Sequence, residues 1–179
     1  MYGMVINALE QMVTDRLGGS AWSRVCDKAN VEDTLFLAMS PYPDEVTFAL
    51  AGAAAEEFEL PMGEFLEEFG RCWVPFALTT AYGPLLRGPE TLLASLEGLD
   101  KMHSQIKASL PVLRPPSFKV ESDDAGVNVH YFSDRVGLAP FVVGLLYGLA
   151  EMHAQEVTVR HVVDDAAVGD HEVFRVDYL

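Results

Sequence analysis

Residues 92–116 read LLASLEGLDKMHSQIKASLPVLRPP, and this stretch separates two kinds of sequence. Apolar residues and one histidine recur in it at alternating intervals of four and three: Leu92, Leu96, Leu99, His103, Ile106 and Leu110. That spacing places them on one face of an α-helix, which we expect from about residue 89 to residue 110. The segment 113–116 then ends the helix, because a residue that precedes proline disfavours the helical conformation.

The sequence before this helix is helical in its spacing and has few turn signals. An apolar stripe over 4–13 ends at Gly18-Gly19, and a second short helix is predicted over 20–28. Further helices are predicted over 45–59 and from Pro61, which suits a first helical position because its missing N–H is not needed there. We therefore expect a helical N-terminal part.

After residue 115 the pattern changes to short alternating runs. We expect turns at 123–126 and near Gly169-Asp170, a helix over 137–153, and strands over 117–121, 127–133, 155–163 and 172–178. Two hairpins and a helix predict a four-stranded antiparallel sheet with the helix on one face, which is an α+β fold. The predicted division is a helical subdomain of about 1–60 packed on an α/β subdomain of about 61–179.

Length and charge exclude several classes of protein. With 12 basic and 27 acidic residues the net charge is −15, which would repel nucleic acid phosphates. The longest uncharged runs, 72–86 and 136–150, have 15 residues each, and a membrane span needs about 20. No signal peptide is visible, and two cysteines are too few for a disulfide framework. We expect a cytoplasmic protein that acts on neither nucleic acids nor membranes.

His103 is the one ionisable residue on the stripe of the central helix. It can be a core histidine with its hydrogen bonds satisfied, which is the usual role of a single histidine on an apolar face. It can also be the axial ligand of haem iron, since a neutral imidazole in an apolar cavity is a common proximal ligand. Spacing alone leaves both interpretations open.

A second candidate site is the run Tyr131-Phe132-Ser133-Asp134-Arg135. If the strand continues through it, residues 131, 133 and 135 share one face and present a phenol, a hydroxyl and a guanidinium. Such a row would bind carboxylates, with Arg135 able to bind in a bidentate way. The alternative is an ordinary polar strand end. Haem carries two propionates, so His103 and this run together offer an axial ligand and a carboxylate clamp.

The segment 56–68 holds six acidic residues and no basic one. The plain interpretation is a solvated face; the functional one is a docking surface for a basic partner.

Taken together, these motifs resemble the H-NOX family, the haem nitric oxide/oxygen binding domain also found in soluble guanylate cyclase. The resemblance covers essentially the whole chain. It lies in the opening Met1-Tyr2-Gly3, in the helix around His103, in the Leu113-Arg114-Pro115-Pro116 segment, and in Tyr131-x-Ser133-x-Arg135 followed by Val136-Gly137-Leu138-Ala139-Pro140. A Y-x-S-x-R pattern with a histidine 28 residues upstream is a strong signal for this family.

The resemblance implies a b-type haem held between the two subdomains. His103 then corresponds to the proximal ligand and to the metal-binding residue. Tyr131, Ser133 and Arg135 correspond to the propionate clamp, and Pro116 to the family proline that presses on the porphyrin. The distal pocket positions correspond to Val5, Trp73, Phe141 and Leu145.

The resemblance also implies a choice of gas. Oxygen-binding members have a tyrosine, a hydrogen-bond donor, at the position of Phe141, and phenylalanine cannot donate. We therefore expect binding of NO and CO and exclusion of O₂. Trp73 carries an indole N–H that could partly replace the missing donor, or it is a core aromatic residue.

The expected function is a non-catalytic gas sensor that signals to a separate effector, by resemblance a histidine kinase or a cyclic-di-GMP enzyme. NO would weaken the bond between His103 and iron and release strain held at Pro116. Two alternatives remain: a haem enzyme of peroxidase or oxygen-activating type, against which no distal His–Arg pair is seen, and a haem-free adaptor module.

Overall fold

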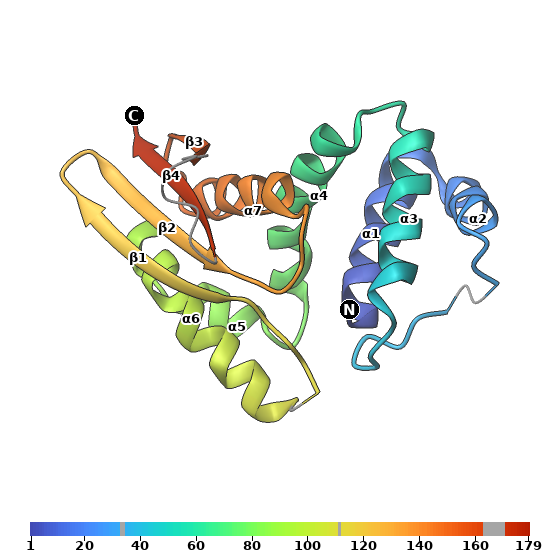
Figure 1. The fold of residues 1–179 in the computed structure, drawn as a ribbon, viewed down its shortest axis with the longest axis horizontal. Coiled ribbons are helices and arrows are strands. Elements are labelled where there is room, and N and C mark those ends of the chain that lie inside the picture. The colour runs from blue at the N-terminus through green and yellow to red at the C-terminus, as the bar shows by residue number, and fades with distance from the viewer. Residues whose placement is uncertain (33–34, 111, 163–170) are drawn as a thin grey trace. The chain divides into compact units, whose positions relative to one another are not determined.

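The computed structural model describes residues 1–32, 35–110, 112–162 and 171–179, which divide into two compact units (Figure 1). The first unit, Met1–Phe69, contains α1 (Gly3–Leu17), α2 (Gly19–Lys28), α3 (Asp44–Glu57) and the beginning of α4 (Met62–Thr79). Gly18 separates α1 from α2 with φ 86°, a left-handed conformation that glycine adopts without strain. The core of this unit consists of fully buried residues that include Ile6, Leu9, Val13, Val25, Leu50 and Phe65.

The second unit, Gly70–Leu179, combines helices with one sheet. Its helices are the rest of α4, α5 (Gly83–Arg87), α6 (Leu92–Ser109) and α7 (Ala139–Met152). Its strands are β1 (Ser117–Asp123), β2 (Gly126–Phe132), β3 (Val157–Val162) and β4 (Glu172–Tyr178), in the spatial order β1-β2-β4-β3 with antiparallel pairing. The prediction of an α+β fold with a four-stranded antiparallel sheet is confirmed.

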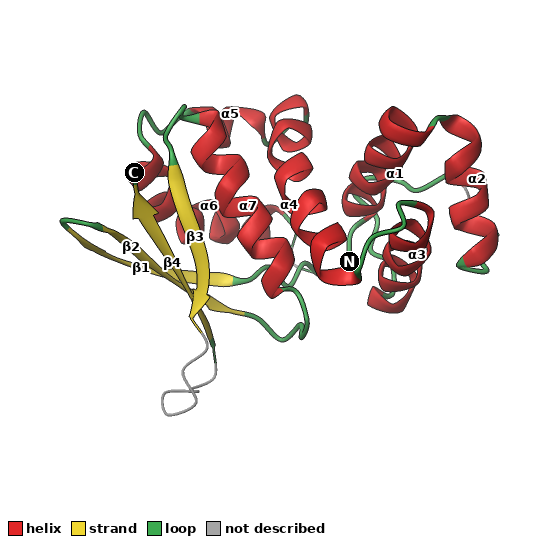
Figure 2. Ribbon diagram, turned by 90° about the horizontal axis from the view of Figure 1, so that it is seen from above, coloured by secondary structure: helices red, strands yellow, loops and turns green. Residues whose placement is uncertain are grey.

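The two faces of this sheet differ in what covers them. Val129 and Tyr131 of β2 and Phe174 of β4 are buried in one core with α6 and α7, represented by Leu96 and Leu146. These helices lie on one side of the sheet (Figure 2). The opposite face carries polar side chains such as those of Asn128, His130 and Arg175. The alternation of β2 therefore follows from burial of one face only.

Element ends are where the sequence predictions and the structure differ. Helix α6 begins at Leu92 because the Thr91 side chain accepts a hydrogen bond from Ala94 N–H at 3.2 Å, capping the helix. Strand β2 ends at Phe132, one residue earlier than predicted, and the short helix α5 was not predicted.

The predicted turn at 123–126 is confirmed. The Asp123 carboxylate accepts hydrogen bonds from the N–H groups of Ala125 and Gly126, each at 2.9 Å. The turn predicted near Gly169-Asp170 lies outside the described residues. Among the helices that the structure describes, none has the length and apolar character needed to cross a membrane.

Candidate haem site

Helix α6 carries His103 beyond the buried core. Leu96 is fully buried and Leu99 is 8% exposed, whereas His103 and Ile106, further along the same apolar stripe, are only half-buried. The apolar stripe thus continues beyond the part of α6 that is packed against the sheet and α7.

The hydrogen bond of the His103 ring decides which nitrogen is free. Nδ1 lies 2.8 Å from the carbonyl oxygen of Leu99, and because a carbonyl only accepts, Nδ1 carries the hydrogen and Nε2 the lone pair. Burial lowers the pKa of His103 below its ordinary value, which keeps the ring neutral at pH 7. Among the described residues Nε2 has no hydrogen-bond partner. A neutral imidazole held in this way is the form that binds a metal through Nε2.

Asp100, one helical turn before His103, joins α6 to the start of β1. Its Oδ1 accepts a hydrogen bond from Ser117 Oγ at 2.7 Å and another from Phe118 N–H at 3.0 Å. These two bonds hold the pKa of Asp100 below its ordinary value. The ring of Phe118 in turn lies with its centroid 5.2 Å from that of His103. The first residues of β1 are therefore held against the histidine.

Tyr131 continues this chain of rings across the sheet. It pairs with Phe118 of β1 and Glu172 of β4, and its ring centroid is 5.6 Å from that of Phe118. Burial raises the pKa of Tyr131, and a hydrogen bond with the Ser133 side chain opposes that effect. The phenol thus stays protonated at pH 7 and can donate.

Ser133 and Arg135 are placed by a turn, not by the strand. The strand does not continue through these residues, because β2 ends at Phe132, so the condition under which residues 131, 133 and 135 would share one strand face is not met. After it the Ser133 hydroxyl oxygen accepts a hydrogen bond from Arg135 N–H at 3.1 Å, which turns the backbone out of the ladder. Ser133 nevertheless contacts the Tyr131 hydroxyl, so the turn keeps these two groups together.

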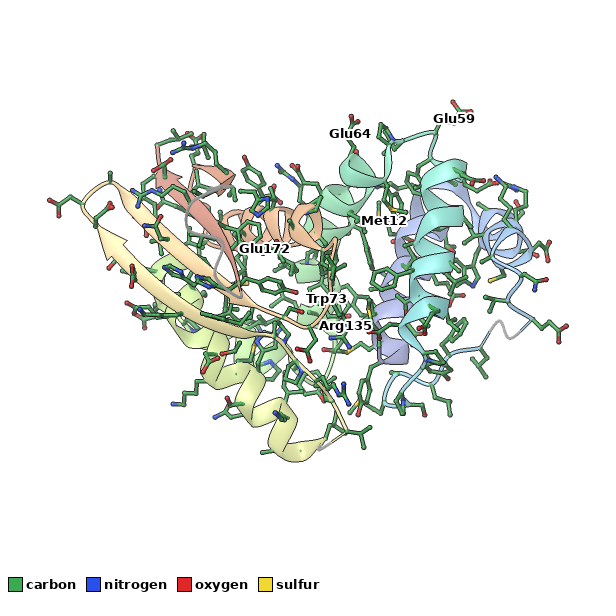
Figure 3. The ribbon with its side chains drawn as sticks, viewed as in Figure 1. Met12, Glu59, Glu64, Trp73, Arg135 and Glu172 are labelled. Carbon is green, nitrogen blue, oxygen red and sulfur yellow. The ribbon has the colours of Figure 1, made fainter. Side chains whose placement is uncertain are left out.

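Arg135 reaches back from the segment between β2 and α7 (Figure 3) to the segment before β1. Its Nη1 donates to the carbonyl oxygen of Arg114 at 2.9 Å. Pro116 lies between Arg114, which Arg135 binds, and Ser117, which Asp100 binds. The half-buried proline is therefore held from both sides.

Three of the four predicted distal residues belong to the second unit. Trp73 of α4 and Phe141 of α7 contact edge to face, with ring centroids 6.4 Å apart, and Leu145 lies one turn beyond Phe141. The helices come close because position 70 is glycine: a Cβ there would lie 2.1 Å from the carbonyl oxygen of Phe141. Val5 is half-buried in α1 of the first unit, so its place beside the other three stays a prediction.

The acidic segment 56–68 is partly neutralised within its own unit. Arg24 and Lys28 of α2 both bind Glu57, at 2.8 and 3.0 Å, and Arg16 of α1 binds Glu68. Glu59 and Glu64 are exposed near the turn before α4 (Figure 3). A docking role for this surface stays a prediction.

A family model described as haem–NO-binding matches residues 2–161. The chain belongs to the haem–NO-binding family. Its curated relatives include soluble guanylate cyclase 89Db of Drosophila melanogaster, 26% identical over 84% of this chain, and soluble guanylate cyclase gcy-35 of Caenorhabditis elegans, 29% identical over all of it. The matched regions make up 23% and 28% of those relatives, so the chain spans about a quarter of their length.

Solved structures of H-NOX proteins share the fold. The Fe(II) form of a variant H-NOX protein from S. oneidensis superposes with a TM-score of 0.90 at 19% identity, covering all of this chain and 96% of that one. An H-NOX protein from K. algicida gives a TM-score of 0.83 at 15% identity, covering 100% and 97%. The family relationship rests on the sequence match, and these structures add that the haem–NO-binding fold is present.

The residues of the second unit fit a haem. His103 offers a free imidazole lone pair beside apolar side chains that the fold only half covers. Tyr131, Ser133 and Arg135 supply the neutral and cationic donors that carboxylates require. Of the residues predicted from sequence, the structure brings these four and Pro116 into one connected arrangement.

Asp100 is the residue that sequence reasoning missed. Its position three residues before His103 is a signal only when its bonds to β1 are known, since an acid on the polar side of a helix usually faces water.

Proposed function

We propose that this chain is a haem-based gas sensor that holds a ferrous b-type haem. His103 is the axial ligand, Tyr131, Ser133 and Arg135 bind the propionates, and Pro116 contacts the porphyrin. The single observation that carries the proposal is the bond from His103 Nδ1 to the Leu99 carbonyl, which leaves Nε2 as a neutral ligand on a half-covered apolar face. When bound, the haem supplies the iron at which a diatomic gas binds.

The purified protein should show a Soret band, and His103→Gly should lose it unless free imidazole is added. Gln105→Gly, an exposed position on the same helix, is the matched control, because it makes the same backbone change without removing a ligand or an apolar side chain from the proposed haem face. If His103→Gly kept the wild-type ferrous spectrum without imidazole, the assignment would be wrong. A colourless wild-type protein would instead favour the adaptor alternative.

The proposed ligands are NO and CO, with O₂ excluded. Bound O₂ carries partial negative charge and needs a hydrogen-bond donor, and Phe141 has none. The proposed distal side consists of four residues: Val5, Trp73, Phe141 and Leu145. Trp73 lies against Phe141, so its indole N–H is the donor that could oppose the exclusion.

Spectra of the ferrous protein in air test the choice of gas. We expect no stable oxy complex in the wild type and some gain of O₂ affinity in Phe141→Tyr. A stable oxy spectrum in the wild type that disappears in Trp73→Phe would show that the tryptophan donates to O₂, and the proposed exclusion would then be wrong.

The proposed output is a signal to a separate effector, a histidine kinase or a cyclic-di-GMP enzyme, in the cytoplasm, and the chain itself is proposed to be non-catalytic. The bonds of Asp100 support a route for it: a shift of His103 together with α6 is passed to Ser117 and Phe118 of β1, and so to Pro116. The proposed division at about residue 60 separates a distal helical subdomain from a proximal α/β subdomain, and the latter also supplies Trp73, Phe141 and Leu145 to the distal side.

A further inference from the structure

Two histidines meet on the sheet face opposite the proposed site. Nδ1 of His130 in β2 lies 2.9 Å from Nε2 of His171, the residue before β4. The other nitrogen of His130, Nε2, lies 3.5 Å from Glu121 Oε2 of β1. The His171 ring stacks on Phe132, with centroids 4.4 Å apart and an angle of 23° between the planes. This pair links the end of β2 to the beginning of β4.

The pair adjoins the proposed propionate clamp. His130 directly precedes Tyr131, and Phe132 directly precedes the turn that places Ser133 and Arg135. Tyr131 also forms the last residue pair between β2 and β4, with Glu172. The stacked His171 ring therefore covers the strand end from which the clamp residues extend.

The chemistry of the pair depends on how many protons it holds. A hydrogen bond between two imidazoles needs one N–H and one lone pair. With one extra proton, His130 can donate Nδ1–H to His171 and point Nε2–H at Glu121, so the first proton preserves the bond. A second proton places N–H on both facing nitrogens and two like charges 2.9 Å apart, which the bond cannot survive.

The other charged groups that the structure describes on this face do not remove that repulsion. Lys119 of β1 binds Glu121 at 2.8 Å and so shares the carboxylate with His130. Arg175 of β4 is held by Asp123 and Asp177, and Arg160 of β3 by Asp177. The helices α6 and α7 pack on the opposite face, where Glu172 lies near His161. Among the residues that the structure describes, Glu121 is thus the acid that faces the pair, and it can balance one proton.

We propose that the His130–His171 pair makes haem retention depend on pH: one added proton leaves the clamp intact, and a second opens the strand end that carries it. This inference rests on the proposed haem function. Histidine is the side chain that can change charge between about pH 5 and 8, so this is the range in which the opening is tested. The opening is expected to speed haem loss about fivefold, the effect of losing about one net hydrogen bond.

The decisive variant is His171→Gln. Its neutral amide can still bond to His130 but takes up no proton, so the repulsion cannot develop. Transfer of haem to apomyoglobin gives the rate of haem loss between about pH 5.5 and 7.5. Acid also speeds haem loss through other groups, in the wild type and in His171→Gln alike. The quantity to follow is therefore the ratio of the two rates of haem loss. His153→Gln, which changes a histidine bound to Ser95 elsewhere in the unit, is the control.

The wild-type rate divided by the His171→Gln rate should rise about fivefold as the pH falls, while the ratio for His153→Gln stays constant. NMR of the histidine side chains follows proton uptake by His130 as the pH falls. Its pH dependence should differ between the wild type and His171→Gln. Two results would overturn this inference without affecting the proposed haem function. One is a Soret band together with a pH-independent ratio of wild-type to His171→Gln rates. The other is proton uptake by His130 that is the same in wild type and in His171→Gln. A wild-type protein without a Soret band would overturn both the inference and the proposed haem function.

Discussion

The two halves of helix α6 share one apolar spacing but have different environments. In the first half Leu92, Leu96 and Leu99 are buried against the sheet and α7. In the second half His103 and Ile106 occupy the same stripe and are only half-buried. Regular spacing therefore identifies a covered face without showing what covers it: the sheet and α7 cover the first half, and we propose that a haem covers the second.

The largest expected effect is on the free energy of unfolding, and it should distinguish Leu96→Ala from Ile106→Ala. Leu96→Ala should lower the free energy of unfolding by ~2–5 kcal/mol, with or without haem, because it leaves a cavity in a closed core. Ile106→Ala should have a clearly smaller effect in haem-free protein and a larger one in loaded protein. Urea unfolding of both forms measures this. If Ile106→Ala were equally destabilising in haem-free and haem-loaded protein, haem would not cover the second half of α6.

The next effect concerns the clamp. Arg135→Ala should weaken haem binding by about 1.5–3 kcal/mol, the range for a hydrogen bond to a charged group. Ser133→Ala should weaken it less, because that hydroxyl carries no charge. Haem content and transfer rates provide the measurement. Equal haem retention in wild type, Arg135→Ala and Tyr131→Phe would exclude a propionate clamp here.

The smallest effect concerns the bond between α6 and β1. Asp100→Asn should lower the free energy of unfolding by about 1 kcal/mol at pH 7, because an amide is a weaker acceptor for Ser117 and Phe118. The pKa of Asp100 is lowered in the folded protein, so its contribution is present above the ordinary carboxyl range and is lost as pH falls through the lowered pKa.

The free energy of unfolding, measured from about pH 2 to pH 7, shows whether the contribution of Asp100 is lost on acidification. The variant should lose less stability than the wild type on acidification. Glu97→Gln, an exposed acid on the same helix, is the control and should leave the pH profile unchanged. A profile for Asp100→Asn as steep as that of wild type would mean that the carboxylate does not hold β1.

Much of the fold could be predicted because it depends on local patterns. The stripe from Leu92 onward, the break at Gly18 and the turn at Asp123 each follow from spacing or from backbone chemistry within a few residues. Element ends were less accessible. The start of α6 depends on the Thr91 cap, and the end of β2 depends on Ser133 competing for a backbone N–H, and alternation does not encode either one.

The candidate site divides in the same way. His103 and the Y-x-S-x-R run could be found because their residue types and order resemble a family. The bond of Asp100 to β1, the reach of Arg135 to Arg114 and the meeting of His130 with His171 join residues 17, 21 and 41 positions apart. Such contacts arise from tertiary packing, so a single sequence without its fold cannot show them.

Low-frequency resonance Raman spectroscopy of the ferrous protein can show whether Nε2 of His103 binds haem iron. We expect an iron–histidine stretching band that shifts when the histidines carry ¹⁵N. In His103→Gly with imidazole, that band should shift only when the added imidazole is labelled. A band that persists in His103→Gly without imidazole, or that shifts with labelled protein histidine in that variant, would contradict the assignment.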